Sequence, residues 1–232
     1  MSSLEFKNSK IYVYGKGIVE TSLSVKEGKI SSIGEANEGI ELPSNLIVIP
    51  GFVDKHIHGA NNADFMNPTK EDIKKIVGAV VKEGTTSLLA TTMTQSMEAI
   101  TASVKNIGEY VKDNNDGVEI LGIHLEGPFI SKKYKGAQIE SCIVPCDVAT
   151  FKDYQEASGN NILQVTLAYE ENGKELVNYL RDNKIVASLG HTDATCDQAL
   201  EGVKEGITSF THTYNAMKPL HHREAGVVGA AL

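Results

Sequence analysis

The stretch NLIVIPGFVDKHIHG, residues 45–59, is where the pattern of the chain changes. Before it, short β-type runs separated by glycine-containing turns predict a small β-domain over residues 1–50. After it, β-type runs alternate with helical segments. The stretch itself predicts a strand over residues 45–56 that ends in one histidine, His56, with a second, His58, two positions further on.

Residues 51–232 predict a parallel sheet with crossover helices, because six strand–helix units of about 30 residues each follow one another. The predicted strands cover 45–56, 85–94, 117–128, 162–170, 185–193 and 207–217. The predicted helices cover 70–84, 96–113, 146–159, 174–184 and 195–206. The pattern alone fits both a doubly wound sheet and a β/α barrel. A barrel of eight units needs roughly 250 residues, so we expect a barrel here to lack two units at its C-terminal end.

Two helices carry local signals of their own. In the helix 70–84, apolar residues fall on one face at helical spacing: Ile73, Ile76, Val77 and Val80. At the start of the helix 195–206, Thr195 and Gln198 stand at the spacing of a capping box.

Composition excludes some classes of function. A net charge of −8 argues against binding to nucleic acid or to a membrane surface, because phosphate groups attract basic surfaces. No apolar run approaches the roughly 20 residues that span a bilayer, and the first residues contain no signal-peptide core. The chain has three cysteines, Cys142, Cys146 and Cys196, which we expect to be reduced thiols of a cytoplasmic protein.

Candidate metal ligands gather at the predicted strand ends. Residues two apart in a strand share a face, so His56 and His58 can approach one point. The carboxyl ends of parallel strands form one rim, where active sites lie. Three further strands deliver Glu126, His191 and His212 to this rim. Imidazole and carboxylate are suitable ligands for divalent zinc, iron or manganese. A bound ion of this kind lowers the pKa of water toward about 7, which predicts hydrolysis of an amide, ester or phosphoester.

Other polar residues near the rim leave their roles open. His124 shares the face of Glu126 but lies deeper, and we expect it to line the core or support a ligand. Asp54 fits a supporting role and a buried polar role equally. His221 and His222 fit a site and a surface loop equally. A general base is still required, and no aspartate follows Asp197.

Four motifs together resemble the N-acetylglucosamine-6-phosphate deacetylases of the amidohydrolase superfamily. They are PGFVDKHIHG (50–59), HLEGPFIS (124–131), ASLGHTDAT (187–195) and THTYNAMKPLHHREAGVVGA (211–230). The first motif belongs to the wider superfamily, whereas HLEGPF and THTYNAM are characteristic of the deacetylases. The resemblance covers the chain in order, but only about the first six-tenths of a usual member, so the chain looks truncated at its C-terminus.

The resemblance implies a β/α barrel, incomplete over 51–232, together with a β-sandwich of which residues 1–50 form the N-terminal part. It implies removal of acetate from N-acetylglucosamine 6-phosphate in amino-sugar catabolism or recycling. The main metal ion would be bound by Glu126, His191 and His212. His56 and His58 would bind a second ion, with Glu126 shared between the two. One or two divalent ions per chain are implied, of zinc, iron, cobalt or manganese.

The resemblance also implies substrate contacts and an assembly. The substrate phosphate would be held by Asn215, the backbone of Ala216, and Arg223, which in a homodimer reaches across the interface. Gln138 stands where some members have a histidine that touches the sugar. The family's catalytic aspartate lies on the eighth strand, beyond Leu232, so no catalytic residue is assigned in this chain.

Two other functions stay open on the sequence. One is another amidohydrolase reaction, either cyclic-amide hydrolysis or deamination. The other is a non-catalytic truncated chain that keeps a metal or sugar-phosphate site. Several of the site residues also have ordinary readings: Asn215 is a common turn residue, and Arg223 beside Glu224 fits a solvated pair.

Overall fold

The computed structural model describes residues 4–34, 36, 38–113 and 117–232. The chain divides into two compact units, Met1–Gly51 and Phe52–Leu232.

The first unit contains a four-stranded sheet with the order β3-β2-β1-β4. β1 and β2 pair antiparallel, whereas β1 and β4 pair parallel. The glycines of the β1–β2 turn, Gly15 and Gly17, both have positive φ, as the sequence pattern of short strands and glycine turns predicts. The strands are β1 Leu4–Val13, β2 Gly17–Lys26, β3 Lys29–Ile33 and β4 Ile47–Val48.

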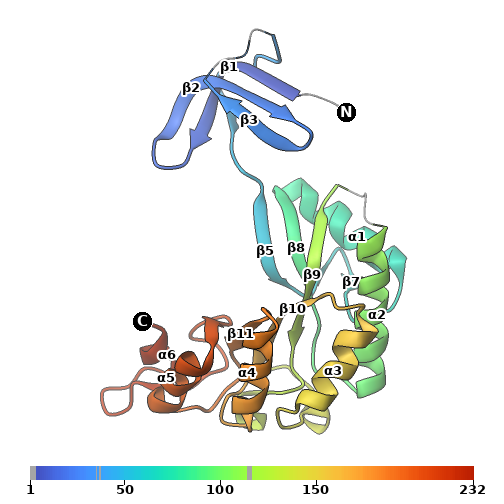
Figure 1. The fold of residues 1–232 in the computed structure, drawn as a ribbon, viewed down its shortest axis with the longest axis vertical. Helices are drawn as coiled ribbons and strands as arrows, with labels where there is room; N and C mark the ends of the chain where they lie inside the picture. The colour runs from blue at the N-terminus through green and yellow to red at the C-terminus, as the bar shows by residue number, and fades with distance from the viewer. Residues whose placement is uncertain (1–3, 35, 37, 114–116) are drawn as a thin grey trace. The chain divides into compact units, whose positions relative to one another are not determined.

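The second unit is built on a six-stranded parallel sheet with the order β12-β11-β10-β9-β8-β5 (Figure 1). Each new strand along the chain adds to the same side of the sheet. A doubly wound sheet reverses its order, so this unreversed order identifies the β/α-barrel type. The strands are β5 Phe52–Ile57, β8 Thr85–Thr91, β9 Glu119–Glu126, β10 Ile162–Leu167, β11 Val186–Leu189 and β12 Ile207–Phe210.

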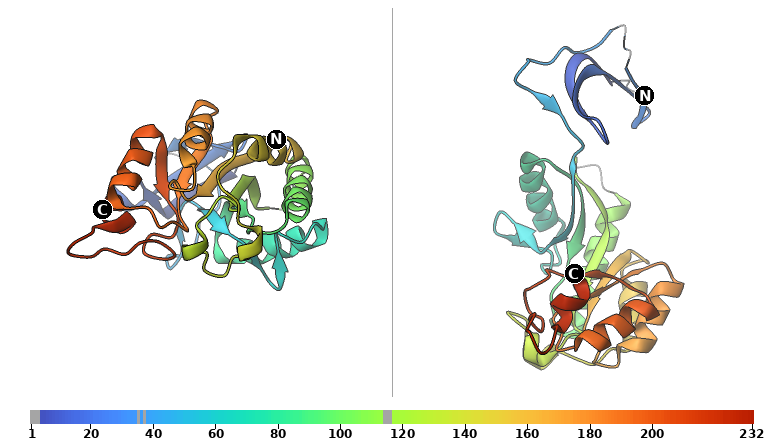
Figure 2. Two further views of the ribbon diagram at one scale, coloured as in Figure 1. Left: turned by 90° about the horizontal axis from the view of Figure 1, so that it is seen from below. Right: turned by 90° about the vertical axis from the view of Figure 1, so that its left-hand side faces the viewer.

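The sheet curls strongly, and the views of Figure 2 show the curl. β5 and β12 lie at opposite edges of the strand order. Even so, Lys55 Nζ on β5 donates a hydrogen bond to Ser209 Oγ on β12 at 3.3 Å. The curl therefore brings the two edge strands within reach of one lysine side chain.

The prediction of one continuous strand over residues 45–56 is wrong, because the structure has two separate strands there. β4 ends at Val48 and pairs with β1 in the first unit, and β5 begins at Phe52 in the second. Pro50 lies between them and has no backbone N–H to donate to a sheet. The apolar run is therefore two strands in two different sheets.

The helices lie along the outer side of the curled sheet (Figure 1). All four predicted core residues of α1 are buried: Ile73, Ile76, Val77 and Val80. Thr195 and Gln198 form the predicted capping box of α5. The helices are α1 Lys70–Val80, α2 Met97–Lys112, α3 Val148–Ala157, α4 Gly173–Asp182, α5 Cys196–Glu205 and α6 Gly226–Ala231. Short 3-10 helices are η1 Val81–Glu83, η2 Lys132–Tyr134 and η3 Glu140–Cys142.

A small hairpin follows the first strand of the curled sheet and was not predicted. β6 Gly59–Ala60 pairs antiparallel with β7 Ala63–Asp64. Asn61 and Asn62 form its turn with φ of 54° and 57°, the conformation that two-residue hairpin turns require. The hairpin places Phe65 in the core, where it is fully buried.

The inner face of the curled sheet carries a chain of hydrogen-bonded polar side chains. His124 Nε2 on β9 lies 2.6 Å from Thr166 Oγ1 on β10. Thr166 Oγ1 lies 2.7 Å from Thr211 Oγ1, which follows β12, and Thr211 Oγ1 lies 2.7 Å from Ser188 Oγ on β11. All four residues are buried. Their polar groups are satisfied by one another, as burial requires.

In the part of the chain that the structure describes, no helix is long and apolar enough to cross a membrane.

Candidate metal centre

Five side chains meet at the carboxyl ends of four strands. They form two groups of potential ligands that share one carboxylate: Glu126 with His56 and His58, and Glu126 with His191 and His212. Glu126 is the last residue of β9, and it is almost completely buried. The structure thus brings together all five residues that the sequence singled out as metal ligands.

The two oxygens of Glu126 face different histidines. Oε1 lies 3.3 Å from Nε2 of His191, 3.3 Å from Nε2 of His212 and 3.5 Å from Nε2 of His56. Oε2 lies 3.0 Å from Nε2 of His58. The carboxylate therefore stands between two pairs of imidazoles.

The spacing of the imidazole nitrogens fits a shared cation. His191 Nε2 and His212 Nε2 are 3.1 Å apart, and His56 Nε2 and His58 Nε2 are 3.3 Å apart. Two nitrogens that each lie about 2.0–2.1 Å from one ion are about 2.8–3.4 Å apart for angles between 90° and the tetrahedral value. Glu126 Oε1 is buried and has no hydrogen-bond partner among the described residues. A buried carboxylate oxygen without a donor is costly unless a cation faces it, so these residues fit a metal ion.

Backbone carbonyls hold three of the rings. Nδ1 of His58 lies 3.3 Å from the Thr91 carbonyl, and Nδ1 of His191 lies 2.8 Å from the Tyr134 carbonyl. Nδ1 of His212 lies 3.0 Å from the carbonyl of Asn215. A carbonyl can only accept, so each Nδ1 carries the proton and each Nε2 presents its lone pair to the centre.

The backbone at two of the histidines is in an unusual conformation. His191 and His212, each two residues beyond the end of a strand, have φ of 48° and 33°. Non-glycine residues seldom adopt positive φ, and they do so where the surroundings hold them. The Tyr134 and Asn215 carbonyls supply part of that hold.

The electrostatics of the centre favour an ionised carboxylate. Burial alone raises the pKa of Glu126, but the four imidazoles around it outweigh burial and hold that pKa far below its usual range. Burial works to lower the pKa of His58, yet the hydrogen bond that Nε2 donates to Glu126 when the ring is protonated raises that pKa overall. The same carboxylate raises the pKa of His212. Burial lowers the pKa of His124 to about 3, so that ring is neutral at ordinary pH.

His124 lies beside the centre but outside both ligand groups. Its ring centroid is 4.8 Å from that of His56, and its nitrogens bond to Thr166 and to the Lys55 carbonyl. It lines the interior of the sheet. Asp54, half-buried, accepts a hydrogen bond from the backbone N–H of His56 at 3.0 Å.

The predicted substrate residues are placed in different ways. Asn215 and Ala216 share a loop with His212, and Asn215 is exposed. Arg223 is exposed in a turn closed by backbone hydrogen bonds between His221 and Glu224. His221 and His222 are exposed, and their ring centroids lie 4.1 Å apart with the planes tilted at 44°. Gln138 is buried, and its amide is bonded at both ends, to Thr94 and to Glu126.

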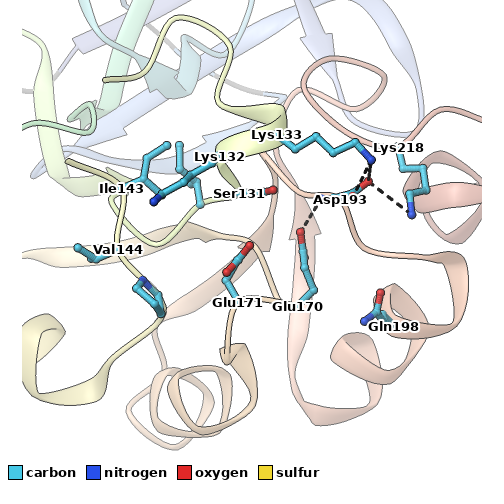
Figure 3. Close-up of a pocket in the computed structure, with 12 residues that line it drawn as sticks. Ser131, Lys132, Lys133, Ile143, Val144, Glu170, Glu171, Asp193, Gln198 and Lys218 are labelled. Carbon is cyan, nitrogen blue, oxygen red and sulfur yellow. Dashed lines mark hydrogen bonds and ion pairs between the residues drawn. The ribbon is translucent and has the colours of Figure 1, made fainter. Parts of the chain in front are cut away.

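A cavity of about 660 Å³ opens beside the rim, and Figure 3 shows the residues that line it. Its central group is Asp193, two residues after His191, whose carboxylate pairs with Lys133 at 2.9 Å and Lys218 at 3.5 Å. Glu170 lies next to it and accepts hydrogen bonds from the Thr192 hydroxyl and the Asp193 backbone. Burial raises the pKa of Glu170.

The sequence interpretation missed the residues that support the ligands. Glu170 follows β10, so the strand-end rule that selected Glu126 also points to it. The carbonyls of Thr91, Tyr134 and Asn215 have no sequence signal, because every residue has one.

Comparison with known proteins finds relatives of this chain. The model of the amidohydrolase family matches residues 47–231. N-acetylglucosamine-6-phosphate deacetylase of Bacillus subtilis is 40% identical over 99% of this chain and 61% of its own length. The enzyme of the same name from Lysinibacillus sphaericus is 42% identical over 90% of this chain and 55% of its own.

A solved structure has the same fold. It is a variant of N-acetyl-D-glucosamine-6-phosphate deacetylase from Mycobacterium smegmatis in complex with N-acetyl-D-glucosamine-6-phosphate. It superimposes with a TM-score of 0.88 at 27% identity, over 99% of this chain and 60% of that one. This chain thus spans about six-tenths of the length of the relatives it matches.

Proposed function

Because the chain belongs to the amidohydrolase family, we propose that it hydrolyses the acetamide of N-acetylglucosamine 6-phosphate to glucosamine 6-phosphate and acetate. The observation that carries the proposal is the convergence of His56, His58, Glu126, His191 and His212 on one point at the rim. The relatives that are 40% and 42% identical are named for this reaction. Amino-sugar catabolism or recycling is the proposed context.

The five residues are proposed to hold one or two divalent ions of zinc, iron, cobalt or manganese. Glu126, His191 and His212 form the main site, and His56 and His58 share Glu126 in a second one. A bound ion supplies Lewis acidity, which polarises the amide carbonyl and makes bound water acidic near neutral pH. The protein's own contribution is to hold neutral imidazoles with their Nε2 lone pairs directed inward, through the carbonyls described above.

The sugar phosphate is proposed to lie over the loop that follows His212. Asn215 and the backbone of Ala216 lie on this loop, and Arg223 follows it in the next turn. A guanidinium suits phosphate because its planar fork donates two hydrogen bonds at once. Gln138 is the proposed neighbour of a sugar hydroxyl. The nearby Lys218 is already paired with Asp193 and is not assigned to the phosphate.

Three further proposals concern the whole protein. Residues 1–50 are the N-terminal part of a small β-sandwich domain, and residues 51–232 belong to the β/α-barrel catalytic domain. The protein acts as a homodimer, in which Arg223 reaches the partner's substrate. It works in the cytoplasm, in agreement with free thiols at Cys142, Cys146 and Cys196.

The test uses three sugars with the chain loaded with Zn²⁺ or Co²⁺: N-acetylglucosamine 6-phosphate, its C4 epimer N-acetylgalactosamine 6-phosphate, and unphosphorylated N-acetylglucosamine. We expect metal-dependent binding of the first, and acetate release from it, in preference to the other two. A protein that binds the metal but neither binds nor hydrolyses the first sugar contradicts the proposal. Ring opening of a cyclic amide or ammonia release from a nucleobase would favour another reaction of the family.

A further inference from the structure

Gln138 lies buried between the metal centre and the loop that follows β8. It sits between η2 and η3, and only 3% of its surface is exposed. The backbone N–H of Thr94 donates to its Oε1 at 2.6 Å, and its Nε2 donates to Glu126 Oε2 at 3.1 Å. The Gln138 side chain therefore ties the loop that follows β8 to the shared carboxylate at the end of β9.

The orientation of this amide is fixed by its partners. A backbone N–H can only donate, so the group that faces Thr94 must be the oxygen. The –NH₂ group must then face Glu126, and an ionised carboxylate is a strong acceptor for it.

The two oxygens of Glu126 are not held equally. Oε2, on the side of His58, receives the Gln138 hydrogen bond, whereas Oε1 has no hydrogen-bond donor among the described residues. Partial rotation of the carboxylate about its last bond would turn both oxygens away from the histidines that they face. The Gln138 hydrogen bond opposes that rotation, and it leaves Oε1 directed toward His191 and His212.

We infer that Gln138 is a positioning residue that fixes the carboxylate of Glu126, and that it acts most strongly on the ion site formed with His56 and His58. The inference rests on the metal site proposed above. The reason for the asymmetry is contact: Gln138 bonds to Oε2, the oxygen that lies 3.0 Å from His58 Nε2, whereas His191 and His212 face Oε1. Loss of a hydrogen bond to a ligand typically weakens metal binding by about 10–100-fold.

The experiment is a calorimetric titration of the metal-free chain with Co²⁺, in three backgrounds. The wild-type chain comes first, followed by His58→Ala and His191→Ala, which each disable one of the two sites. Gln138→Met keeps the length of the side chain and removes its N–H, and it is introduced into each background. These combined variants separate the effect of Gln138→Met on one ion site from its effect on the other.

We expect Gln138→Met to weaken Co²⁺ binding by about 10–100-fold in the His191→Ala background. In the His58→Ala background, we expect a change of less than about threefold. The Co²⁺ absorption spectrum of the two-site protein should change only in the part lost in the His58→Ala variant. Equal losses in both backgrounds, or no loss in either, would overturn the inference.

Gln155→Met is the matched control. The Gln155 amide also accepts from a backbone N–H and donates to a carbonyl, both of Ile162, but it does not contact the centre. We expect it to lower the melting temperature and leave Co²⁺ binding unchanged. An equal effect on Co²⁺ binding would mean that Gln138 acts only through general stability.

A second variant guards against misfolding, and the wild-type titration separates the two proposals. Gln138→Asn keeps a buried amide that is one methylene too short to reach both Thr94 and Glu126, so the same selective loss is expected. If the wild-type chain binds no Co²⁺, the metal site itself is wrong. If the wild-type chain binds Co²⁺ and neither Gln138 variant differs from it, only the role of Gln138 is wrong.

Discussion

Glu126 is the residue on which the centre depends. A carboxylate with almost no exposed surface is destabilised by burial, and the imidazoles around it, the Gln138 hydrogen bond or a cation at the centre offset that cost. Both ligand groups contain it. The two sites are therefore not independent, because they share the charge that makes each of them possible.

Glu126→Gln should reduce metal binding at both sites. The substitution keeps the shape of the side chain and removes its charge. Because loss of a ligand charge weakens ion binding at both sites, we expect the affinity for Zn²⁺ to fall by at least about tenfold. Zinc content after dialysis against a weak chelator measures it. Glu171→Gln is the control, since Glu171 lines the neighbouring cavity but belongs to neither ligand group. Retention of a full complement of zinc by Glu126→Gln would contradict the shared-ligand arrangement.

Gly127→Ala should destabilise the fold. Gly127 has φ of 75°, and a Cβ there would collide with the hydroxyl of buried Thr94. We expect a loss of about 2–4 kcal/mol in the free energy of unfolding, from the strained backbone and the collision together. Urea denaturation measures it.

Gly78→Ala is the matched control for this substitution. Gly78 lies in α1, and a Cβ there would meet nothing within 4 Å. We expect the control to stabilise the protein by up to about 1 kcal/mol, because alanine is the better helix former. Equal effects of the two substitutions would exclude the close approach of Gly127 to Thr94.

The convergence of the five candidate ligands was predictable, but their orientation was not. His56, His58, Glu126, His191 and His212 follow from one rule, that parallel strands end on one rim. The link from Gln138 to Thr94 joins residues 44 positions apart through a loop whose path the sequence does not specify. The contacts between the imidazole rings and the backbone carbonyls depend on positive φ at residues such as His191. Local propensity does not predict that conformation.

At the scale of elements, three rim loops are tied together by one carboxylate. Asp193 follows β11, Lys133 lies in η2 after β9, and Lys218 follows β12 (Figure 3). Each of these loops also carries part of the centre: His191, the Tyr134 carbonyl and His212. The ion pairs thus couple the positions of three loops: two carry the candidate ligands His191 and His212, and the third carries the Tyr134 carbonyl that faces His191.

Asp193→Asn should lower stability in a pH-dependent way. Burial works to raise the pKa of Asp193, but Lys133 and Lys218 outweigh burial and lower it. A lowered pKa means that the stabilisation is complete above the unfolded value of about 4 and is lost as pH falls through the folded value. We expect the melting temperature of the metal-free variant to be lower by about 1–4 °C at pH 7. The difference should close at lower pH.

Asp182→Asn serves as the control for the loss of a paired carboxylate. Asp182 is exposed and bonds to its own neighbour Arg181 in α4, so it ties no loops together. We expect little change at either pH. A difference for Asp193→Asn that persists unchanged at pH 3 would show that its effect is not electrostatic.

Regular elements were predicted better than their connections. The helices follow apolar spacing at 3.6 residues and local caps, which are encoded within a dozen residues. The break at Pro50 was missed because the apolar run continues through it. The β6–β7 hairpin was missed because its strands are two residues long, too short for alternation to show. Its Asn61–Asn62 turn was the available signal.

At the scale of the molecule, the candidate metal centre belongs to one of the two compact units. All five candidate ligands belong to the second unit, in β5, after β5, in β9, and after β11 and β12. A bound ion would join these strands at the rim, and a ligand that binds only the folded state stabilises it by mass action. The first unit contributes none of the five.

Removal of the ion should therefore loosen one unit selectively. After treatment with a chelator, we expect faster amide hydrogen exchange in β5, at the end of β9 and in residues 211–217. Exchange in β1 and β2 should stay the same, because local stability need not be uniform across a chain. Re-addition of Zn²⁺ should restore slow exchange. Faster exchange spread evenly over both units would contradict the assignment of the ion to the rim.

The buried chain from His124 to Ser188 has a directional consequence. The His124 ring is neutral, and its Nδ1 faces the Lys55 carbonyl at 3.1 Å, so Nδ1 carries the only ring proton. Nε2 must then accept from the Thr166 hydroxyl, which in turn accepts from Thr211, which accepts from Ser188. All three hydroxyls therefore donate in the same sense along the chain of bonds, from Ser188 through Thr211 and Thr166 to His124. The position of one proton on the His124 ring thus sets the direction of every hydrogen bond in this buried chain. If one hydroxyl changed from donor to acceptor within the chain, the other two would have to change with it.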